Sequence, residues 1–494
     1  MKLKKILRIP AIVLFCLTFC FINCYAASYD NYVYTNKGEP YYEPTAYLPS
    51  KIIRGEELGI GVFKELQDVV VGKDGRVYIL DSGNNRVVIL SKEHTVISVI
   101  EKITVKNKET KLNSPMGLFV KDELLYIADS GNSRILKYNL QSNACTEFKK
   151  PIISMLGDDY TYTPLKIAVD SADRIFVVAK DITNGMIQLS PDGAFSCFFG
   201  AIETTPTALE IFWRRFMTKE QLARQQTSIP TEYSNLSIDE KGFIYGTISA
   251  MDMEEFSFSP EDTKHQFIRK LNPLGSDVLR RLGEYSPCGD ISVKNDSKGN
   301  PITSKIIDVA VLTDGRYSLL DSEKGRVFTY SNDGELLYIF GGLGDKKGLF
   351  EQPSAIDVTE NQIYYIIDTG YNQLTVFEPT EYAKKILDAT SKSFNMQYEE
   401  SEKAWLEVMN YSTGSDIAYV GMGKALLRQG KHEEAEKYFN MGHSRENYSE
   451  AFSKNRDMAI KKYFAVTVSA ILILILIVVV CKFIRRMRKG EQNA

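Results

Sequence analysis

Histidine and tryptophan are scarce in this 494-residue chain, which contains four His and two Trp. Between residues 60 and 380, where β-strand patterns dominate, only His94 and His265 occur. Because a metal centre built on imidazole ligands needs several histidines close together, that kind of centre is excluded there. The chain also lacks a Gly-x-Ser-x-Gly nucleophile elbow and a phosphate-binding loop that ends in Lys-Ser or Lys-Thr. Serine-nucleophile and nucleotide-binding classes are therefore not indicated.

Cysteine is limited as well. Of the seven cysteines, three lie near the N-terminus and one in a C-terminal apolar run; the remaining three are Cys145, Cys197 and Cys288. Three cysteines cannot all pair with one another, so the chain does not carry a disulfide framework. One bridge with one free thiol stays open.

Excess positive charge is absent too. The net charge is -3, and no basic stripe with interleaved aromatics is found among the repeats, so no nucleic-acid partner is expected. Tyrosine and phenylalanine are plentiful, with 28 and 25 copies, which is typical of a β-rich protein.

What the chain does contain is a turn phrase that occurs four times, each time between two runs of apolar residues. Its Asp, Gly, Asn and Arg positions are Asp81, Gly83, Asn84, Arg86; Asp129, Gly131, Asn132, Arg134; Asp321, Gly325, Arg326; and Asp368, Gly370, Asn372. Glycine permits positive φ, and Asp or Asn side chains bond nearby backbone amides, so the phrase predicts tight turns. Each Arg is expected to pack its stem across a strand and offer its guanidinium to an Asp or a carbonyl.

The spacing of the phrase predicts a propeller. The first two copies are 48 residues apart and the last two 47 apart, which is the length of four short strands with turns. One such unit cannot bury both faces, whereas several arranged radially can. Six units can be counted between about 60 and 380. Residues 28–60, with Tyr32-Val33-Tyr34 as a candidate strand, are expected to complete the last blade.

These units resemble NHL repeats: an upstream Pro, an apolar run ending in Asp, a strand that begins with Gly, and the Asp-x-Gly-Asn-x-Arg turn. The resemblance is strong in the first two units, fair in the last two and weak in the middle pair. It implies a mainly β fold, a six-bladed propeller over residues 27–380. Residues 205–230 interrupt the β pattern and predict a helical insertion, which either shapes a binding mouth or simply packs on the surface.

After residue 380 the apolar period changes from two to 3.6, which predicts consecutive helices over 381–460. Two of them, at 415–429 and 432–443, have the spacing of a tetratricopeptide repeat. Small residues at Gly423 and Ala435 allow close helix approach, and Gly430 makes the turn.

Both ends of the chain carry membrane-related patterns. Residues 1–26 read as a secretory signal cleaved after Ala26; the rival is a lipoprotein signal that ends at Cys24. Residues 464–484 predict one transmembrane helix, followed by a basic tail at 485–494. The expected arrangement is a single-pass membrane protein with its bulk outside the cytoplasm.

Two functions stay open. Six-bladed propellers that the chain resembles include calcium-dependent lactonases and esterases of the gluconolactonase kind, and Asp68, Asp308 and Asp357 are candidate calcium ligands. The plainer interpretation is that these carboxylates bond the backbone. Convergence of three carboxylates in the channel would favour an enzyme, and an apolar plug would disfavour it.

The favoured function is a binding or scaffold role without a cofactor. The chain resembles membrane-anchored NHL-repeat proteins of Gram-positive bacteria, which implies a partner outside the cytoplasm, either a protein or a glycan. That interpretation accounts for the helices, the membrane anchor and the poverty of reactive side chains. The propeller itself supports either function.

Overall fold

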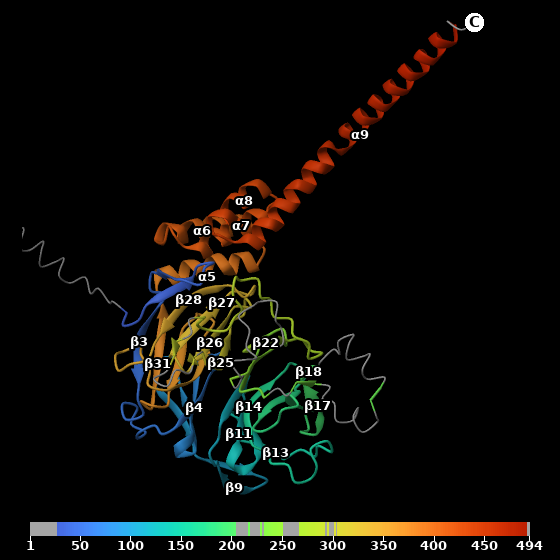
Figure 1. Cartoon of the computed structure of the whole chain (residues 1–494). Helices are drawn as coiled ribbons and strands as arrows, with labels where there is room; N and C mark the ends of the chain where they lie inside the picture. Colours follow the sequence, from blue (N-terminus) through green and yellow to red (C-terminus); the bar gives the residue numbers. More distant parts are fainter. Residues whose placement is uncertain are drawn as a thin grey trace, which may run out of the picture.

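The computed structural model of the chain describes residues 27–203, 216–217, 228–229, 232–249, 266–291, 294–295, 301–302 and 304–491. The predicted signal segment and most of the predicted insertion at 205–230 lie outside these residues. The described part is a six-bladed propeller followed by C-terminal helices (Figure 1).

Three blades come from the first half of the propeller. The first consists of β4 (Leu66–Val71), β5 (Val77–Asp81), β6 (Arg86–Leu90) and β7 (Val96–Ile100). The second consists of β10 (Gly117–Lys121), β11 (Leu124–Asp129), β12 (Arg134–Asn139) and β13 (Cys145–Lys149), extended by the hairpin of β8 (Lys102–Val105) and β9 (Lys108–Lys111). The third consists of β14 (Pro164–Val169), β15 (Ile175–Ala179), β16 (Met186–Leu189) and β17 (Phe195–Phe199).

Three blades come from the second half. The fourth consists, within the described residues, of β20 (Asn235–Ile238), β21 (Ile244–Thr247) and β22 (Ile268–Leu271). The fifth consists of β25 (Ile306–Val311), β26 (Tyr317–Asp321), β27 (Arg326–Tyr330) and β28 (Leu336–Gly341). The sixth consists of β29 (Pro353–Val358), β30 (Tyr364–Asp368), β31 (Gln373–Pro379) and β3 (Tyr47–Ile53).

The first strands of the six blades form a closed inner ring. Their order around the ring is β4, β10, β14, β20, β25 and β29, and β29 contacts β4 again. The first and fourth blades are therefore opposite each other. Three short two-stranded pairs stand apart from the blades: β1 (Asn31–Tyr34) with β2 (Pro40–Glu43), β18 (Ile202–Glu203) with β19 (Ser228–Ile229), and β23 (Lys294–Asn295) with β24 (Pro301–Ile302).

The N-terminal segment closes the ring, as predicted, but not with the predicted strand. β3 pairs antiparallel with β31, so the sixth blade combines strands from both ends of the propeller and its edge is covered. The candidate strand at Tyr32 belongs to β1, which pairs with β2 and packs against β28. The Asn31 side chain fixes this position, because its Oδ1 accepts a hydrogen bond from the backbone N–H of Ile339 at 2.8 Å.

The repeated turn is held by its Asp. In the first blade, Oδ2 of Asp81 accepts hydrogen bonds from Asn84 at 2.9 Å and from Nε of Arg86 at 2.7 Å. Oδ1 of Asp81 accepts the backbone N–H of Lys64, and Nη1 of Arg86 donates to the carbonyl of Ile60, both at 2.8 Å. Each turn thus ties its own blade to the segment that enters it.

The glycine of the turn has a different role from the one expected. In the first, second and fourth copies the positive φ belongs to a later residue: Asn85, Ser133 and Asn372, with φ near 50°. Gly83 is needed because a Cβ there would lie 2.8 Å from the carbonyl oxygen of Lys64. Only Gly325, in the third copy, has positive φ, at 63°. Close approach of a neighbouring backbone, rather than left-handed conformation, requires glycine in the first two copies, and at Gly370 the crowding group is the Glu351 side chain.

The third copy also uses its arginine differently. Nη1 of Arg326 donates to the hydroxyl of Tyr32 and to Asp290 at 3.2 Å. The hydroxyl of Tyr34 donates to the same Asp290 carboxylate. This arginine therefore anchors the N-terminal hairpin of β1 and β2 to the fifth blade.

Helices follow the propeller as the change of period predicts. They are α5 (Glu381–Phe394), α6 (Tyr398–Tyr411), α7 (Asp416–Arg428), α8 (His432–Met441) and α9 (Arg445–Glu491). Thr380 caps α5 by accepting the backbone N–H of Ala383 on its hydroxyl oxygen. Each of these helices packs against the next one.

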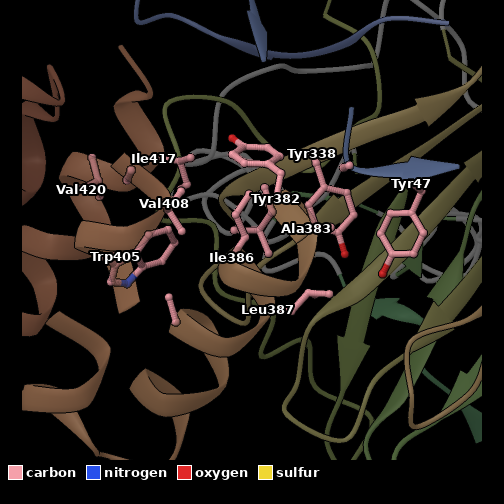
Figure 2. Packing of buried hydrophobic residues seen from close by; sticks show 14 of the residues in the cluster. Tyr47, Tyr338, Tyr382, Ala383, Ile386, Leu387, Trp405, Val408, Ile417 and Val420 are labelled. Atoms are coloured by element: carbon pink, nitrogen blue, oxygen red, sulfur yellow. The ribbon is translucent and has the colours of Figure 1, made fainter. Parts of the chain in front are cut away.

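One hydrophobic core joins the helices to the propeller. It contains Tyr47 and Tyr338 from the sixth and fifth blades, Tyr382 and Ile386 from α5, and Trp405 from α6. Figure 2 shows these side chains in one continuous layer between the strands and the helices. Because no solvent layer separates the two parts, they form one packed unit.

The last helix extends away from this unit (Figure 1). In the described part of the chain, α9 is the one helix long and apolar enough to cross a membrane, with a mean hydropathy of 3.2 in its most apolar window. The predicted helical segment and the predicted span are not separated by a break, because α9 runs unbroken from Arg445 to Glu491. The four cysteines of the described residues are free, so the alternative of one disulfide finds no support.

Candidate functional site in the central channel

The inner ring encloses an open cavity. Its volume is about 1070 Å³, and it is lined by all six inner strands and by the turns that follow them. Apolar side chains such as Val69, Leu118 and Ile356 line it together with the polar ones. The repeated Asp-x-Gly-Asn turns do not line it; Asn84 and Arg86 of the first copy line a separate polar cavity of about 470 Å³.

The three predicted carboxylates all line this channel, and each one bonds the backbone of an inner strand. Oδ2 of Asp68 accepts the N–H of Leu118 at 2.7 Å, in the next blade. Oδ2 of Asp308 accepts the N–H of Ile356 at 2.8 Å, again in the next blade.

Asp357 completes the pattern across the point of closure. Its Oδ2 accepts the N–H of Val71 at 2.7 Å, so the sixth blade is bonded to the first. Its Oδ1 accepts the N–H of Val358 at 2.8 Å. The inner strand of a blade has an edge with no further strand to pair with, and these carboxylates satisfy some of its N–H groups.

Two other polar side chains belong to the same layer. Nζ of Lys166 lies 2.8 Å from Oδ1 of Asp68, and Nδ2 of Asn235 donates to Oδ1 of Asp308 at 2.6 Å. Sequence reasoning missed both residues. Lys166 pairs with the residue just before the end of the second strand of its blade, as Asp68 and Asp308 do in theirs, and Asn235 pairs with the last residue of β21. That alignment is the signal that could have found them.

These three carboxylates do not form a ready-made calcium site. Every oxygen of Asp68, Asp308 and Asp357 already accepts a hydrogen bond or an ion pair from the protein. Among the residues that the structure describes, no group of three or more His, Cys, Asp or Glu side chains is placed to hold a metal ion. Calcium binding at these residues stays a prediction without geometric support.

Two of the channel carboxylates, Asp308 and Asp357, have raised pKa values. Burial raises the pKa of Asp308 to about 6; Lys166 lowers this pKa and Asp68 raises it. Burial also raises the pKa of Asp357 to about 7; its two backbone hydrogen bonds lower this value, and Asp308 and Asp68 raise it. Lys166 contacts Asp68 directly and acts on Asp308 only from a distance, and neither Asp308 nor Asp357 has an ion pair with a cation among the described residues.

The mouth of the channel is formed by the turns between the first and second strands. Lys73, in the first blade, reaches Glu240, in the fourth, with 2.6 Å between Nζ and Oε1. Ser391 of α5 also lines the cavity, and the ammonium of Lys241 lies 4.7 Å from the ring centre of Phe394. The mouth therefore opens on the side of the propeller that carries α5.

Comparison with known proteins supports the repeat. Residues 63–90 match the family model of the NHL repeat. No curated protein sequence matches the chain.

Several solved structures are similar to part of the chain. A streptogramin B lyase is 9% identical, with a TM-score of 0.40, and the match covers 68% of this chain and 98% of that one. A virginiamycin B lyase from Staphylococcus aureus is 8% identical, with a TM-score of 0.37, covering 64% and 94%. A protein of unknown function from Bacteroides thetaiotaomicron is 11% identical, with a TM-score of 0.41, covering 71% and 76%. Identities this low say nothing about activity.

Proposed function

We propose that this chain is a membrane-anchored binding protein whose propeller channel takes a polar ligand with a positively charged group. The observation that carries the proposal is the pair Asp308 and Asp357, two carboxylates with raised pKa in an open cavity of about 1070 Å³. An ammonium or guanidinium group there would supply the missing charge and favour ionisation of both. Within the described residues, no cluster of metal-ligating side chains competes with this interpretation.

The C-terminal helices have two roles in this proposal, anchoring and spacing. We infer that α9 holds the chain in a bilayer, with the propeller outside the cytoplasm. The pairs α5 with α6 and α7 with α8 act as two tetratricopeptide-like repeats that space the propeller from the bilayer. Close helix contact supports the second pair, since a Cβ at Gly423 would lie 2.6 Å from the Phe439 ring. The whole resembles the membrane-anchored NHL-repeat proteins of Gram-positive bacteria.

Ligand binding is tested on the full chain in lipid nanodiscs, with spermidine as the cationic probe and malonate as the anionic one. We expect saturable heat of binding with spermidine at pH 8 and none with malonate. Because both carboxylates are protonated at low pH, spermidine affinity should fall about tenfold or more at pH 5. Asp357→Asn should weaken binding at pH 8, while Asp74→Asn, at a mouth carboxylate that pairs with Arg76, should not. Equal affinities for spermidine and malonate would overturn the proposal.

The alternative function is a calcium-dependent lactonase or esterase of the gluconolactonase kind. The same preparation titrated with calcium tests it. Saturable calcium binding that is lost in Asp308→Ala would favour the enzyme, and a screen of lactone substrates would follow.

A further inference from the structure

The ion pair between Lys73 and Glu240 spans the channel mouth. Lys73 lies in the turn between β4 and β5, and Glu240 in the turn between β20 and β21. These turns belong to the first and fourth blades, which are opposite each other in the ring. Both residues line the channel cavity. A contact of 2.6 Å between opposite blades therefore crosses the entrance rather than bordering it.

The surroundings of Lys73 are acidic. Besides Glu240, its ammonium faces Glu360 of the sixth blade and Asp122 of the second. A single lysine thus lies among carboxylates from three other blades. Packing does not hold it there, because its side chain is 75% exposed and that of Glu240 is 55% exposed.

α5 narrows the same entrance from one side. It begins beside the sixth blade at Thr380, and its last residue, Phe394, lies under the ammonium of Lys241 in the fourth blade. Because Lys241 is the neighbour of Glu240, the turn that carries the ion pair is also the turn that contacts the helix. Access to the channel from this side is therefore limited by α5 and by the ion pair together.

We propose that Lys73 and Glu240 form an electrostatic gate, and that a ligand enters the channel only when this ion pair is broken. The proposal rests on the proposed function, since a gate matters for a channel that takes a ligand. An exposed Lys–Glu pair is weak and is screened by salt, so the gate opens readily and opens more often at high ionic strength. A cationic ligand has an additional route, because it can replace Lys73 on Glu240.

The test measures access without any ligand. All native cysteines are replaced by serine, and Ser237→Cys is introduced at a position that lines the channel. The full chain in nanodiscs is then labelled with methyl methanethiosulfonate, which is uncharged, so its rate reports the opening of the mouth. We expect Glu240→Gln to raise the labelling rate about two- to fivefold, the range set by the strength of an exposed ion pair. Lys73→Glu, which places two like charges together, should raise it at least as much.

Two controls make the result specific. The charge swap Lys73→Glu with Glu240→Lys restores the pair with its polarity reversed, so it should return the rate to that of the parent. Glu123→Gln removes another mouth carboxylate, one that pairs with Arg76 of the adjacent blade and not across the entrance, and should leave the rate unchanged. Melting curves followed by circular dichroism identify any variant that does not fold.

A salt series on the parent gives a second readout that depends on no gate variant. Labelling should accelerate from 50 mM to 1 M salt in the parent and stay flat in Glu240→Gln. Equal labelling rates in the parent, Glu240→Gln and Lys73→Glu would overturn the gate. That outcome would leave the spermidine result untouched, and a failure of spermidine to bind would not alter the labelling rates, so the two proposals fail separately.

Discussion

The ammonium of Lys424, in α7, lies 2.9 Å from Oδ2 of Asp333 and 2.9 Å from Oε2 of Glu335, in the turn between β27 and β28. One lysine thus binds two carboxylates of the fifth blade and joins the helices to the propeller by charge as well as by apolar packing. The carboxylates hold the pKa of Lys424 above its usual value despite its burial.

Removal of this lysine should destabilise the chain strongly. Lys424→Met keeps the aliphatic stem but leaves Glu335 partly buried without its cation, and we expect a loss of about 3 kcal/mol in the free energy of unfolding. Urea unfolding of the full chain in nanodiscs measures it. Lys437→Met is the matched control, because that lysine forms only an exposed pair within α8 and should change stability by about 0.5 kcal/mol or less. If both variants lost a similar amount of unfolding free energy, the role of Lys424 in joining α7 to the fifth blade would be contradicted.

The close contact between α6 and α7 depends on a glycine in α7. A Cβ at Gly421 would lie 2.2 Å from the indole ring of Trp405, which is buried. Gly421→Ala should therefore cost about 1–3 kcal/mol of stability, even though alanine is the better helix former. Thermal unfolding followed by circular dichroism checks this expectation. A rise in melting temperature would show that the two helices are not packed this closely.

The buried side chain of Glu43, at the junction of the N-terminal hairpin and α7, should make the stability of the chain depend on pH. Its carboxyl is 8% exposed, and neither oxygen has a hydrogen-bond partner of ordinary geometry. Burial raises its pKa to about 7; the Ser415 hydroxyl lowers this value and Asp416 raises it. The folded state therefore binds the proton more tightly than the unfolded state, whose carboxyl has its ordinary pKa. This contribution to stability is present at low pH and is lost as the pH rises from about 4.5 to about 7.

Glu43→Gln removes the ionisable group while it keeps the shape. We expect the variant to be more stable than the parent at pH 8, by about 1–3 kcal/mol, and to show little difference at pH 4.5. Unfolding at both pH values tests it, with Glu39→Gln, on the exposed side of the hairpin, as the control. If the parent became more stable relative to Glu43→Gln as the pH rises, the raised pKa of Glu43 would be contradicted.

Asp357 and Asp308 should make the stability of the chain depend on pH in the same direction as Glu43 does. Both folded-state pKa values are raised, to about 7 and about 6, so stability from their protonation is present at low pH and is lost as the pH rises from about 4 to about 7. Asp357→Asn should flatten the melting temperature between pH 5 and pH 8. If the channel binds a cation, saturating spermidine should raise the melting temperature at pH 8 and have less effect at pH 5.

Much of the propeller could be predicted from local sequence. The turn phrase, its spacing near 48 residues and the change of period after residue 380 were enough for the blades and the helices, because each is encoded within a few neighbouring residues. The use of an N-terminal strand for closure was predictable from the need to cover an edge. Which strand closes the ring was not, because β1 and β3 are both short and apolar, and the choice depends on contacts with β28 and β31.

The channel was harder to predict than the blades. Asp68, Asp308 and Asp357 could be selected as inner-strand carboxylates. Their backbone partners, however, lie in adjacent blades, and Lys166 reaches Asp68 from the third blade, so these contacts need the order of the ring. Lys73 and Glu240 are 167 residues apart and each reads as an ordinary turn residue. Their contact appears only when the first and fourth blades are placed opposite each other. The glycine at Gly83 shows the same limit, since the carbonyl that excludes a Cβ belongs to Lys64, outside the turn itself.

The unbroken course of α9 connects the candidate membrane span directly to the packed unit that carries the channel. A helix of 47 residues is about 70 Å long, and its first turns are packed into the same core that holds α5 against the propeller. If α9 spans a bilayer as proposed and stays straight, a change in its tilt would turn the propeller with it. The direction in which the channel mouth points would then depend on the thickness of the bilayer and on the neighbours of the span.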